Sequence, residues 1–556
     1  MMTSSSYTYI RIRDEEPEDA PSADENVETS TKGKKPYFGM TGTTLNAWVT
    51  VACTTAMTLF GYDQGVFGGI IITESFLETM GNPDANLQGT IVSLYDIGCF
   101  TGAMATFAFG ERYGRKKTLL IGVIIMSIGA VLQTSAFTVA HMIVGRLITG
   151  FGNGINTATA PVWQSEASKP SLRGKLIVFS MIMNIAGFSL SNWMTYGFSF
   201  LSGSISWRFP IAFQLVFSII LLSTVPWLPE SPRWLLAHGR EREGVDVLVA
   251  LEGGDTTSKD SHIIEQKMEI LEAVRIENEY SPSWLDLLKG KTGNTGMIKR
   301  LVLGAGTQWM QQLVGINVTS YYLPLVLQNS VGLSNTLSRL LAACNSVSYL
   351  AFSFIGLLLI ESAGRRKLMM WGAGGQCVCY ILITGLLSQA DATSLGAKFG
   401  AGATAFFFVY YVFFGICWQG VPWLYPVEIN SLAMRTKGAA LGTASNWISN
   451  YIVVQITPIG IENLGWKFYI IWAVFNAAFV PLVWVLYPET SNRHLEDIDR
   501  LYRENQNMVF VLGKEEAIQT ERPQRYVDMD HARVAEVEGN TSIRLDSNDD
   551  NTTKAV

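Results

Sequence analysis

"GERYGRKK" at residues 110–117 recurs as "IESAGRRK" at residues 360–367, so the glutamates Glu111 and Glu361 are 250 residues apart. Both copies follow an apolar stretch and precede another one. Two further pairs repeat with similar offsets: "PES" at 229 with "PET" at 488, and Glu166 seven residues before Arg173 with Glu428 seven residues before Arg435. Three similar offsets indicate two homologous halves.

The sequence around these motifs is mostly apolar. Of 556 residues, 48% are hydrophobic and only 16% are charged, which is far more apolar sequence than one soluble core needs. Stretches long enough to cross a hydrocarbon core of about 30 Å lie near 47–72, 87–109, 118–136, 139–163, 175–199, 207–227, 298–327, 337–360, 368–388, 399–424, 438–460 and 466–486. The sequence therefore predicts an all-α polytopic membrane protein with twelve transmembrane helices in two pseudo-symmetric six-helix halves.

The polar segments divide the chain further. We expect a disordered N-terminal tail at 1–45, one half at 46–227, a helical linker at 228–297, the second half at 298–487 and a polar tail at 488–556. Lys and Arg gather in the loops after spans 2, 4, 8 and 10, in "ERYGRKK", "KPSLRGK", "ESAGRRK" and "MRTK". By the positive-inside rule these loops, the linker and both termini are cytosolic.

An aspartate interrupts the first apolar span, in "FGYDQGVFGG" at residues 60–69. A carboxylate at the centre of a membrane helix costs roughly 2.5 to 3.5 kcal/mol on translocon-insertion scales. We therefore expect Asp63 to face a partner or a water-filled cavity and to have a function there.

The motifs in their order resemble the sugar porters of the major facilitator superfamily over all twelve spans. The matching pieces are "FGYDQG", "GERYGRKK", "GRLITGFGNG", "PVWQSE" with "RGK", "PESPRW", "QQLVGIN" with "YY", "ESAGRRK", "VPW" with "PVEI", "SNW" and "YPETSNRHLEDI". "ERYGRK", "PVWQSE" and "NWISNYIVVQITPI" are most similar to the fungal branch that contains glycerol-proton symporters and hexose and disaccharide porters. The resemblance implies the major facilitator fold, with a substrate site at the midplane between the halves.

The resemblance also implies a role for Asp63. In proton-coupled sugar porters an aspartate at this position faces an arginine of the fourth span, which matches Arg146 in "VGRLITG". Burial favours the neutral carboxyl and a nearby guanidinium favours the charged one, so the pair can bind and release a proton as its surroundings change. The alternative is a static buried pair that fixes the packing of two helices.

For the substrate, the resemblance assigns binding roles to amide and aromatic side chains of the second half: Gln311, Gln312, Asn317, Tyr321, Trp423 and Asn446. We expect Phe60, Asn184 and Gln419 to join them. Gln311, Asn317 and Tyr321 face one side if the helix is bent or unwound at Gly315. The chain departs from the family where Met181 and Phe188 replace glutamines and where Gln419-Gly420 replaces Gly-Pro. The cavity should therefore favour a smaller polyol, or a sugar held mainly by the second half.

Charged residues at the predicted cytosolic ends of the spans form a candidate gate. In the family such residues lie where the two halves meet and make ion pairs that close the cytosolic side. The residues are Glu111, Arg112, Arg115, Glu166, Arg173 and Glu230 in the first half, and Glu361, Arg365, Arg366, Glu428, Arg435 and Glu489 in the second. The alternative is that these charges only orient membrane insertion, which leaves the repeated glutamates unexplained.

We conclude that the sequence indicates a proton-coupled symporter that imports a sugar or polyol across the plasma membrane by alternating access. The alternatives are a glycerol or polyol symporter, facilitated diffusion, drug efflux and a nutrient sensor that has lost transport. We expect no enzyme activity, cofactor, metal or nucleic-acid partner, and a functional monomer in the lipid bilayer. The glycines of "GFGNG" at 150–154 follow no strand, so we interpret them as helix-packing residues rather than a nucleotide loop.

Overall fold

The computed structural model describes a helical protein. The residues described are 36–168, 173–254, 256–280, 286, 296–392, 395–431, 434–493, 495–505, 510–526 and 528. The predictions for residues 1–35 and for the tail beyond 528 lie outside the described residues. Within the described part every regular element is a helix.

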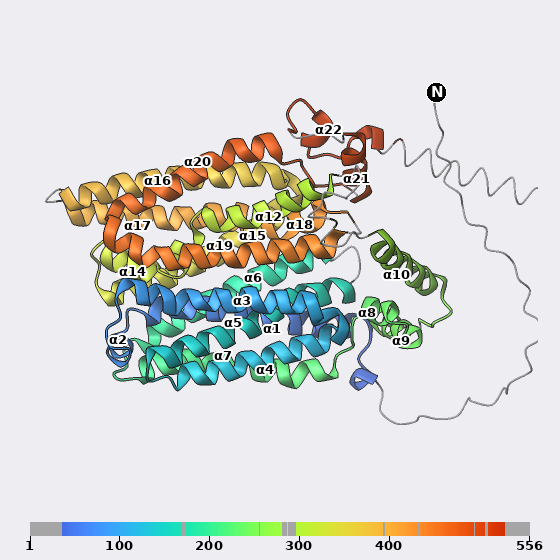
Figure 1. The fold of residues 1–556 in the computed structure, drawn as a ribbon, viewed down its shortest axis with the longest axis horizontal. Helices are drawn as coiled ribbons and strands as arrows, with labels where there is room; N and C mark the ends of the chain where they lie inside the picture. The colour runs from blue at the N-terminus through green and yellow to red at the C-terminus, as the bar shows by residue number, and fades with distance from the viewer. Residues whose placement is uncertain are drawn as a thin grey trace, which may run out of the picture.

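Two groups of helices lie side by side (Figure 1). The first half consists of α1 (Gly42–Ile70), α3 (Ala85–Tyr113), α4 (Arg115–Thr134), α5 (Val139–Ala167), α6 (Arg173–Phe198) and α7 (Ile205–Thr224), with the short α2 (Glu74–Thr79). The second half consists of α12 (Met297–Leu313), α13 (Ile316–Ser320), α14 (Leu323–Asn329), α15 (Asn335–Ala363), α16 (Arg365–Ala392), α17 (Gly396–Phe413), the π-helical η4 (Phe414–Trp418), α18 (Val421–Ile429), α19 (Arg435–Leu464) and α20 (Phe468–Leu486).

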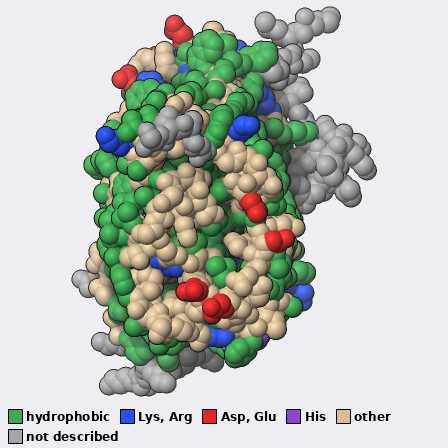
Figure 2. Space-filling model, turned by 90° about the vertical axis from the view of Figure 1, so that its left-hand side faces the viewer, with side chains coloured by type: hydrophobic (Ala, Val, Ile, Leu, Met, Phe, Trp, Pro, Cys, Tyr) green, Lys and Arg blue, Asp and Glu red, His purple; other side chains and the backbone are tan. Residues whose placement is uncertain are grey.

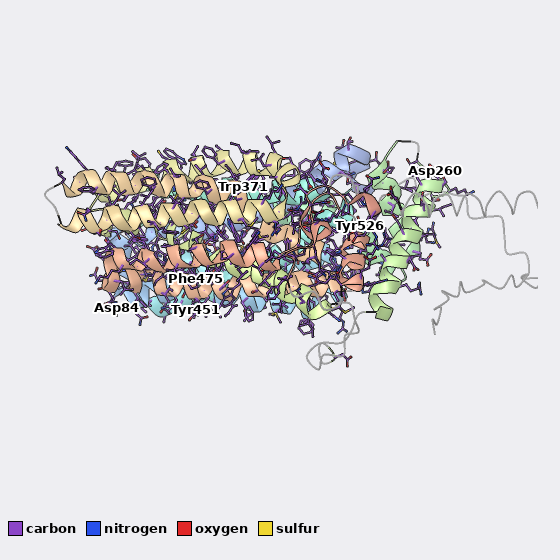
Figure 3. All side chains as sticks on the ribbon, turned by 90° about the horizontal axis from the view of Figure 1, so that it is seen from above. Asp84, Asp260, Trp371, Tyr451, Phe475 and Tyr526 are labelled. Atoms are coloured by element: carbon purple, nitrogen blue, oxygen red, sulfur yellow. The ribbon has the colours of Figure 1, made fainter. Side chains whose placement is uncertain are left out.

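Shorter helices lie at one end of this bundle. They are η1 (Pro36–Gly39), η3 (Val225–Trp227), α8 (Pro232–Ala237), α9 (Glu241–Glu252), α10 (Ser261–Tyr280), α21 (Leu495–Glu504) and α22 (Glu515–Ile518), while η6 (Gly465–Lys467) joins α19 to α20. We call the end that carries α8–α10 the basic end, because Arg115 and Arg365 begin α4 and α16 there. The opposite end is the distal end. Figure 3 shows Asp260 at the basic end and Asp84 at the distal end.

The outer surface of the bundle suits a lipid environment. Large apolar side chains on the flanks are exposed, among them Leu358, Ile219 and Val474. Trp371 of α16, labelled in Figure 3, is one of these exposed side chains. Seen from the distal end, charged side chains are scattered among apolar side chains and backbone (Figure 2). Such exposure of large apolar side chains is what a membrane-spanning bundle requires.

Eight described helical segments are long and apolar enough to cross a membrane. One of them, Arg435–Leu486, contains both α19 and α20, so the eight segments contribute nine spans. The other three spans are α1, α5 and the broken α12–α14, and each of these buries polar side chains such as Asp63, Arg146 and Gln311. The twelve-helix architecture predicted from the sequence is confirmed.

Close packing of α3 on α5 positions the buried charges. A Cβ atom on Gly150 would lie 2.1 Å from the carbonyl oxygen of Tyr95, and one on Gly154 would lie 2.1 Å from that of Cys99. Only glycine permits the two backbones to approach so closely. The glycines of "GFGNG" are therefore helix-packing residues, and they hold α5 directly against the α3 turn that carries Asp96.

Candidate substrate and coupling site

The seventh span is broken in the middle of the membrane. Helix α12 ends at Leu313, and Gly315 has a φ of 92° before α13 begins at Ile316. The break predicted at Gly315 is therefore present. A non-helical backbone inside a membrane needs partners for its carbonyl groups. Tyr410 and Asn476 donate to the Val314 carbonyl at 3.1 and 3.0 Å, and Tyr380 donates to the Gly315 carbonyl at 3.0 Å.

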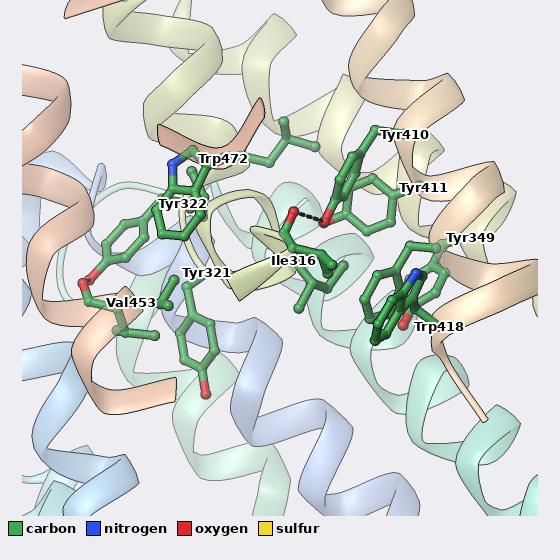
Figure 4. Packing of buried hydrophobic residues seen from close by; sticks show 14 of the residues in the cluster. Ile316, Tyr321, Tyr322, Tyr349, Tyr410, Tyr411, Trp418, Val453 and Trp472 are labelled. Carbon is green, nitrogen blue, oxygen red and sulfur yellow. Dashed lines mark hydrogen bonds between the residues drawn. The ribbon is translucent and has the colours of Figure 1, made fainter. Parts of the chain in front are cut away.

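Aromatic side chains surround this break. Figure 4 shows the hydroxyl of Tyr410 beside the broken backbone, with Tyr411 and Tyr349 on the same side of Ile316. The donors to the two freed carbonyls come from α16, α17 and α20, so three neighbouring helices hold the unwound segment. The break is a fixed part of the fold that brings polar side chains of α12 and α13 to one place.

Amide side chains on both sides of the break bond to one another. Asn446 donates to Gln308 at 2.7 Å and to Gln311 at 3.0 Å. Asn317 donates to Gln312 at 2.5 Å and to Asn450 at 2.6 Å. Each amide offers donors and acceptors, so the set can exchange its internal bonds for bonds to hydroxyl groups of a ligand.

These amides line a cavity of about 50 Å³ between the two halves. This volume is space for only a few water molecules, so a substrate has to widen it. The cavity is lined by eight of the nine residues predicted for substrate binding, namely Phe60, Asn184, Gln311, Gln312, Asn317, Gln419, Trp423 and Asn446. The lining residues that the sequence analysis missed are Gln64, Ile316, Ser320, Tyr349, Phe414, Trp447 and Asn450.

The wall formed by the first half is mainly apolar. Met181 and Phe188, which replace family glutamines, both line the cavity. Phe60 lies against Trp447 with ring centroids 5.4 Å apart. The exceptions are Asn184 and Gln64, and Gln64 donates to Asn317 at 3.1 Å. A mainly apolar wall therefore faces a wall that carries most of the amides, together with apolar side chains such as Ile316, Phe414 and Trp447.

Tyr321 is the predicted binding residue that lies elsewhere. Its hydroxyl donates to Asp96 at 3.3 Å, and its ring points away from Tyr410 and Tyr411 (Figure 4). The left-handed turn at Gly315 and the separate helix α13 rotate this residue out of the row that a bent but continuous helix predicts. Tyr321 therefore does not line the cavity in this structure, and its role in substrate binding stays a prediction.

Asp63 and Arg146 lie together in the centre of the first half. The carboxylate Oδ2 is 3.7 Å from the guanidinium Nη1, and both side chains are fully buried. The guanidinium lies 4.0 Å from the Phe67 ring and 4.3 Å from the Tyr95 ring, and it donates to the Val92 carbonyl at 2.9 Å. The aromatic faces and the carbonyl hold the arginine in place. Asp63 directly precedes Gln64, which lines the cavity, so the ion pair lies one residue away from the cavity wall without lining it.

A second buried carboxylate, Asp96 on α3, is not among the residues predicted from the sequence. Its side chain is fully buried, and Asn450 donates to its Oδ1 at 2.9 Å. The sequence "SLYDIGCF" could have indicated this residue, because Asp96 is a single acidic residue inside the second apolar span. An ionised carboxylate inside a membrane helix is as unfavourable at Asp96 as at Asp63, so Asp96 should also have a function.

At the basic end the two halves build the same cluster twice. Arg115 pairs with Glu166 at 3.0 Å, and Arg365 pairs with Glu428 at 2.7 Å. A hydroxyl joins each glutamate: Ser231 donates to Glu166 at 2.6 Å, and Thr490 donates to Glu428 at 2.7 Å. These contacts explain why "PES" and "PET" repeat along with the arginine motifs.

The glutamates of "PES" and "PET" each accept hydrogen bonds at the start of a helix. Glu230 accepts from the Arg115 backbone N–H at 2.9 Å, and Glu489 accepts from the Arg365 N–H at 2.9 Å. A carboxylate is favourable at a helix N-terminus, where N–H groups lack partners. Burial raises the pKa of Glu230, and the N–H groups of Ser231, Lys116 and Arg115 oppose that rise.

The two repeated arginine–glutamate pairs at this end each join helices of the same half. The expectation that they lie where the halves meet is wrong for Arg115 with Glu166 and for Arg365 with Glu428. The side chains of Glu111 and Arg112 are exposed. Arg366 donates to the Trp484 carbonyl within the second half, and Arg365 also pairs with Glu361 at 2.8 Å. Arg435 begins α19, and the side chain of Arg173 lies outside those that the structure describes.

Hydrogen bonds between the halves occur toward the distal end. Arg339 donates to Thr73 at 2.9 Å, and Asn335 donates to the Ile72 carbonyl at 2.8 Å. Further along the interface, Ser93 donates to Gln455 at 2.6 Å. The distal side of the cavity is therefore closed in this conformation.

Comparisons with known proteins agree with this architecture. The model of the family "Sugar (and other) transporter" matches residues 48–502. The chain is 55% identical to the MFS-type transporter oryC of Aspergillus oryzae over 91% of this chain and 94% of that protein. It is 35% identical to the sugar transporter STL1 of Saccharomyces cerevisiae over 84% of this chain and 83% of that protein. The proton:xylose symporter XylE of E. coli, solved with 6-bromo-6-deoxy-D-glucose, superimposes with a TM-score of 0.68 at 25% identity, covering 82% of this chain and 99% of that one.

A twelve-helix bundle with a polar cavity between its halves defines a transporter of the major facilitator class. This chain belongs to the sugar transporter family of that class. The resemblance recognised from the motifs is confirmed, and the relatives are named as transporters rather than enzymes.

Proposed function

We propose that this protein is a proton-coupled symporter for a neutral sugar or polyol. The observation that carries the proposal is the fully buried Asp63–Arg146 pair, one residue from Gln64 in the wall of an uncharged, amide-containing cavity. A facilitator needs no ionisable pair at this place, whereas a symporter needs a group whose proton affinity depends on solvent access and on a nearby charge.

The lining of the cavity supports a neutral substrate. Every residue that lines it is uncharged, so a carboxylate or ammonium group entering it would lose hydration without gaining a charged partner. The amides of the second half suit a row of hydroxyl groups. The aromatic and apolar wall of the first half suits the apolar face of a sugar ring or a polyol chain.

Alternating access is the mechanism that this arrangement supports. The distal bonds of Arg339 and Asn335 close one side of the cavity, and they have to break when the cavity opens toward that side. The clusters around Arg115 and Arg365 fasten helix ends within each half. We infer that they keep each half rigid at the basic end, so that the halves move as units.

The chain is a multi-pass membrane protein, and we propose that it works in the plasma membrane as a monomer surrounded by lipid. The basic loops and α8–α10 lie at the same end of the bundle, which would be the cytosolic end by the positive-inside rule. The distal side would then be extracellular, and transport with a proton would be import.

The proposal is tested by measuring uptake in cells that lack their own sugar porters. The panel consists of hexoses, pentoses, disaccharides and glycerol, each measured at acidic and neutral pH. We expect accumulation of a neutral member of the panel that is stimulated by acid and abolished by a protonophore. Uptake that only equilibrates would indicate facilitated diffusion, and binding without uptake would indicate a sensor.

We expect Gln419 to contribute to substrate affinity. Its amide lines the cavity, accepts from the Tyr349 hydroxyl and donates to the Met181 carbonyl at 3.5 Å. The donation to Met181 is long and therefore easily exchanged for a ligand hydroxyl. Gln419→Met keeps the side-chain volume but removes the amide, and it should raise the half-saturation constant about tenfold, as the loss of about 1.4 kcal/mol would.

The control for this prediction is Tyr349→Phe, which removes the hydroxyl that occupies the Gln419 oxygen. Affinity should be kept or improved in that variant, because the amide is then free to bond to the substrate. If Gln419→Met leaves the half-saturation constant unchanged, Gln419 serves only to pack the junction of η4 and α18 against its neighbours.

A further inference from the structure

Asp96 lies where the two halves meet, and both of its described donors belong to the opposite half. Asn450 of α19 donates to Oδ1 at 2.9 Å, and the Tyr321 hydroxyl donates to the same oxygen at 3.3 Å. The carboxylate itself is on α3 in the first half and is fully buried. Its charge therefore acts directly on the contact between the halves.

A chain of amides connects Asp96 to the substrate cavity. Asn450 accepts from Asn317 at 2.6 Å, and Asn317 in turn accepts from Gln64 at 3.1 Å. Gln64, Asn317 and Asn450 all line the cavity. The chain begins one residue from Asp63 and ends at Asp96, so a substrate that displaces any of these bonds disturbs the contacts of Asp96.

Arg146 lies against the α3 turn that leads to Asp96, as well as beside Asp63. Its guanidinium bonds to the Val92 carbonyl, one helical turn before Asp96, and lies over the Tyr95 ring. The ionisable groups that act on Asp96 are Arg146 of α5, Asp63 of α1, Tyr321 and Tyr322 of the broken span, and Cys99 on α3 itself. Arg146 is the cation among these groups.

The charges in this group do not balance. Two ionised carboxylates beside one guanidinium would leave a net negative charge in a site that excludes water, which is costly. A proton bound to either carboxylate restores neutrality. When two carboxylates share a site in this way, the proton belongs to the pair rather than to one residue.

We propose that Asp96 is a second carboxylate of the coupling site, which shares the transported proton with Asp63 around Arg146. This inference rests on the proposed symport function. The proton comes from the water on the distal side and forms an O–H bond with one carboxylate, and it leaves to water on the basic side. When Asp96 is ionised, it accepts strongly from Asn450 and Tyr321 of the other half. When it is protonated, it accepts more weakly, so the strength of this contact between the halves depends on the bound proton.

The first test is Asp96→Asn in the full-length protein reconstituted in liposomes, with D-xylose, D-glucose and glycerol as probes. The asparagine oxygen still accepts from Asn450 and Tyr321, but the shared proton has no second site. We expect loss of acid stimulation and loss of accumulation, with counterflow of the probe retained within about threefold, a difference of less than about 0.7 kcal/mol.

The second variant is Tyr321→Phe, which keeps both carboxylates and removes one donor from Asp96. The ionised form of Asp96 then loses a hydrogen bond, so the acid stimulation should shift toward higher pH. If the Tyr321–Asp96 contact were purely structural, its loss would change the rate of uptake by the same factor at every pH. If Asp96→Asn fails to fold, the pH profile of Tyr321→Phe alone tests the role of Asp96.

The matched control is Ser93→Ala on the same helix. Ser93 also bonds across the halves, to Gln455 at 2.6 Å, but carries no ionisable group. It should leave the pH profile unchanged. The inference is overturned if Asp96→Asn and Tyr321→Phe both keep the wild-type pH profile, or if Ser93→Ala alters the profile as they do. If the wild type itself accumulates no probe at any pH, the proposed function fails instead.

Discussion

Asp63→Asn should abolish accumulation of substrate against its gradient, while exchange of substrate across the membrane continues. The asparagine cannot bind a proton, so movement of the carrier is no longer linked to the proton gradient. The cavity residues are unchanged, and the substitution preserves the size of a fully buried side chain. Uptake driven by a pH gradient and counterflow without a gradient, both measured in proteoliposomes, separate the two effects.

The matched control is Asp84→Asn, the same chemical change outside the site. Asp84 caps α3 at the distal end by accepting from the Leu87 N–H at 2.8 Å, and asparagine caps helices about as well. Accumulation should stay normal in this variant. Normal accumulation by Asp63→Asn would show that the Asp63–Arg146 pair only fixes the packing of α1 on α5.

Arg365→Met should destabilise the protein by about 3 kcal/mol, the lower end of the cost of breaking a buried ion pair. Only 4% of the Arg365 side chain is exposed, and it binds Glu428 and Glu361 as well as the Ile360 carbonyl at 2.9 Å. Removal of the guanidinium leaves two carboxylates close together without their cation. Thermal unfolding of the purified protein measures the loss.

The repeat provides the comparison for this prediction. Arg115→Met removes the equivalent residue, which is 15% exposed and pairs with Glu166. Its effect should be smaller than that of Arg365→Met. Labelling of a cysteine placed at Gln64 should rise from the basic end in both variants if the clusters keep the halves rigid. Unchanged labelling and stability would mean that the charges serve only to orient insertion.

The fold was predictable because its evidence is spread along the chain. The repeated motifs and the apolar stretches each predict two halves independently. A wrong boundary for one span does not change the prediction of the others. The break at Gly315 was also predictable, since a glycine inside an amide-rich span marks a place where the helix is interrupted. The apolar wall followed from Met181 and Phe188, which the structure places at the cavity.

The details of the site depended on geometry that the sequence pattern does not contain. Tyr321 lies outside the cavity because the positive φ of Gly315 changes the rotation of every side chain after it. The pairing of Arg115 and Arg365 within each half depends on how α5 and α18 pack, which spacing along the chain does not give. Gln64 was missed although it follows Asp63, because only the three-dimensional structure shows that it reaches Asn317.

The unequal walls of the cavity have an energetic consequence for the transport cycle. If the amides of the second half hold the substrate in every conformation, they bind the inward-open and outward-open states equally and cannot shift the balance between them. Only contacts that form as the cavity closes can drive that closure, and Phe60, Met181 and Phe188 supply them. The amide wall would then set how tightly the substrate binds, and the apolar wall would set how fast the loaded carrier turns over.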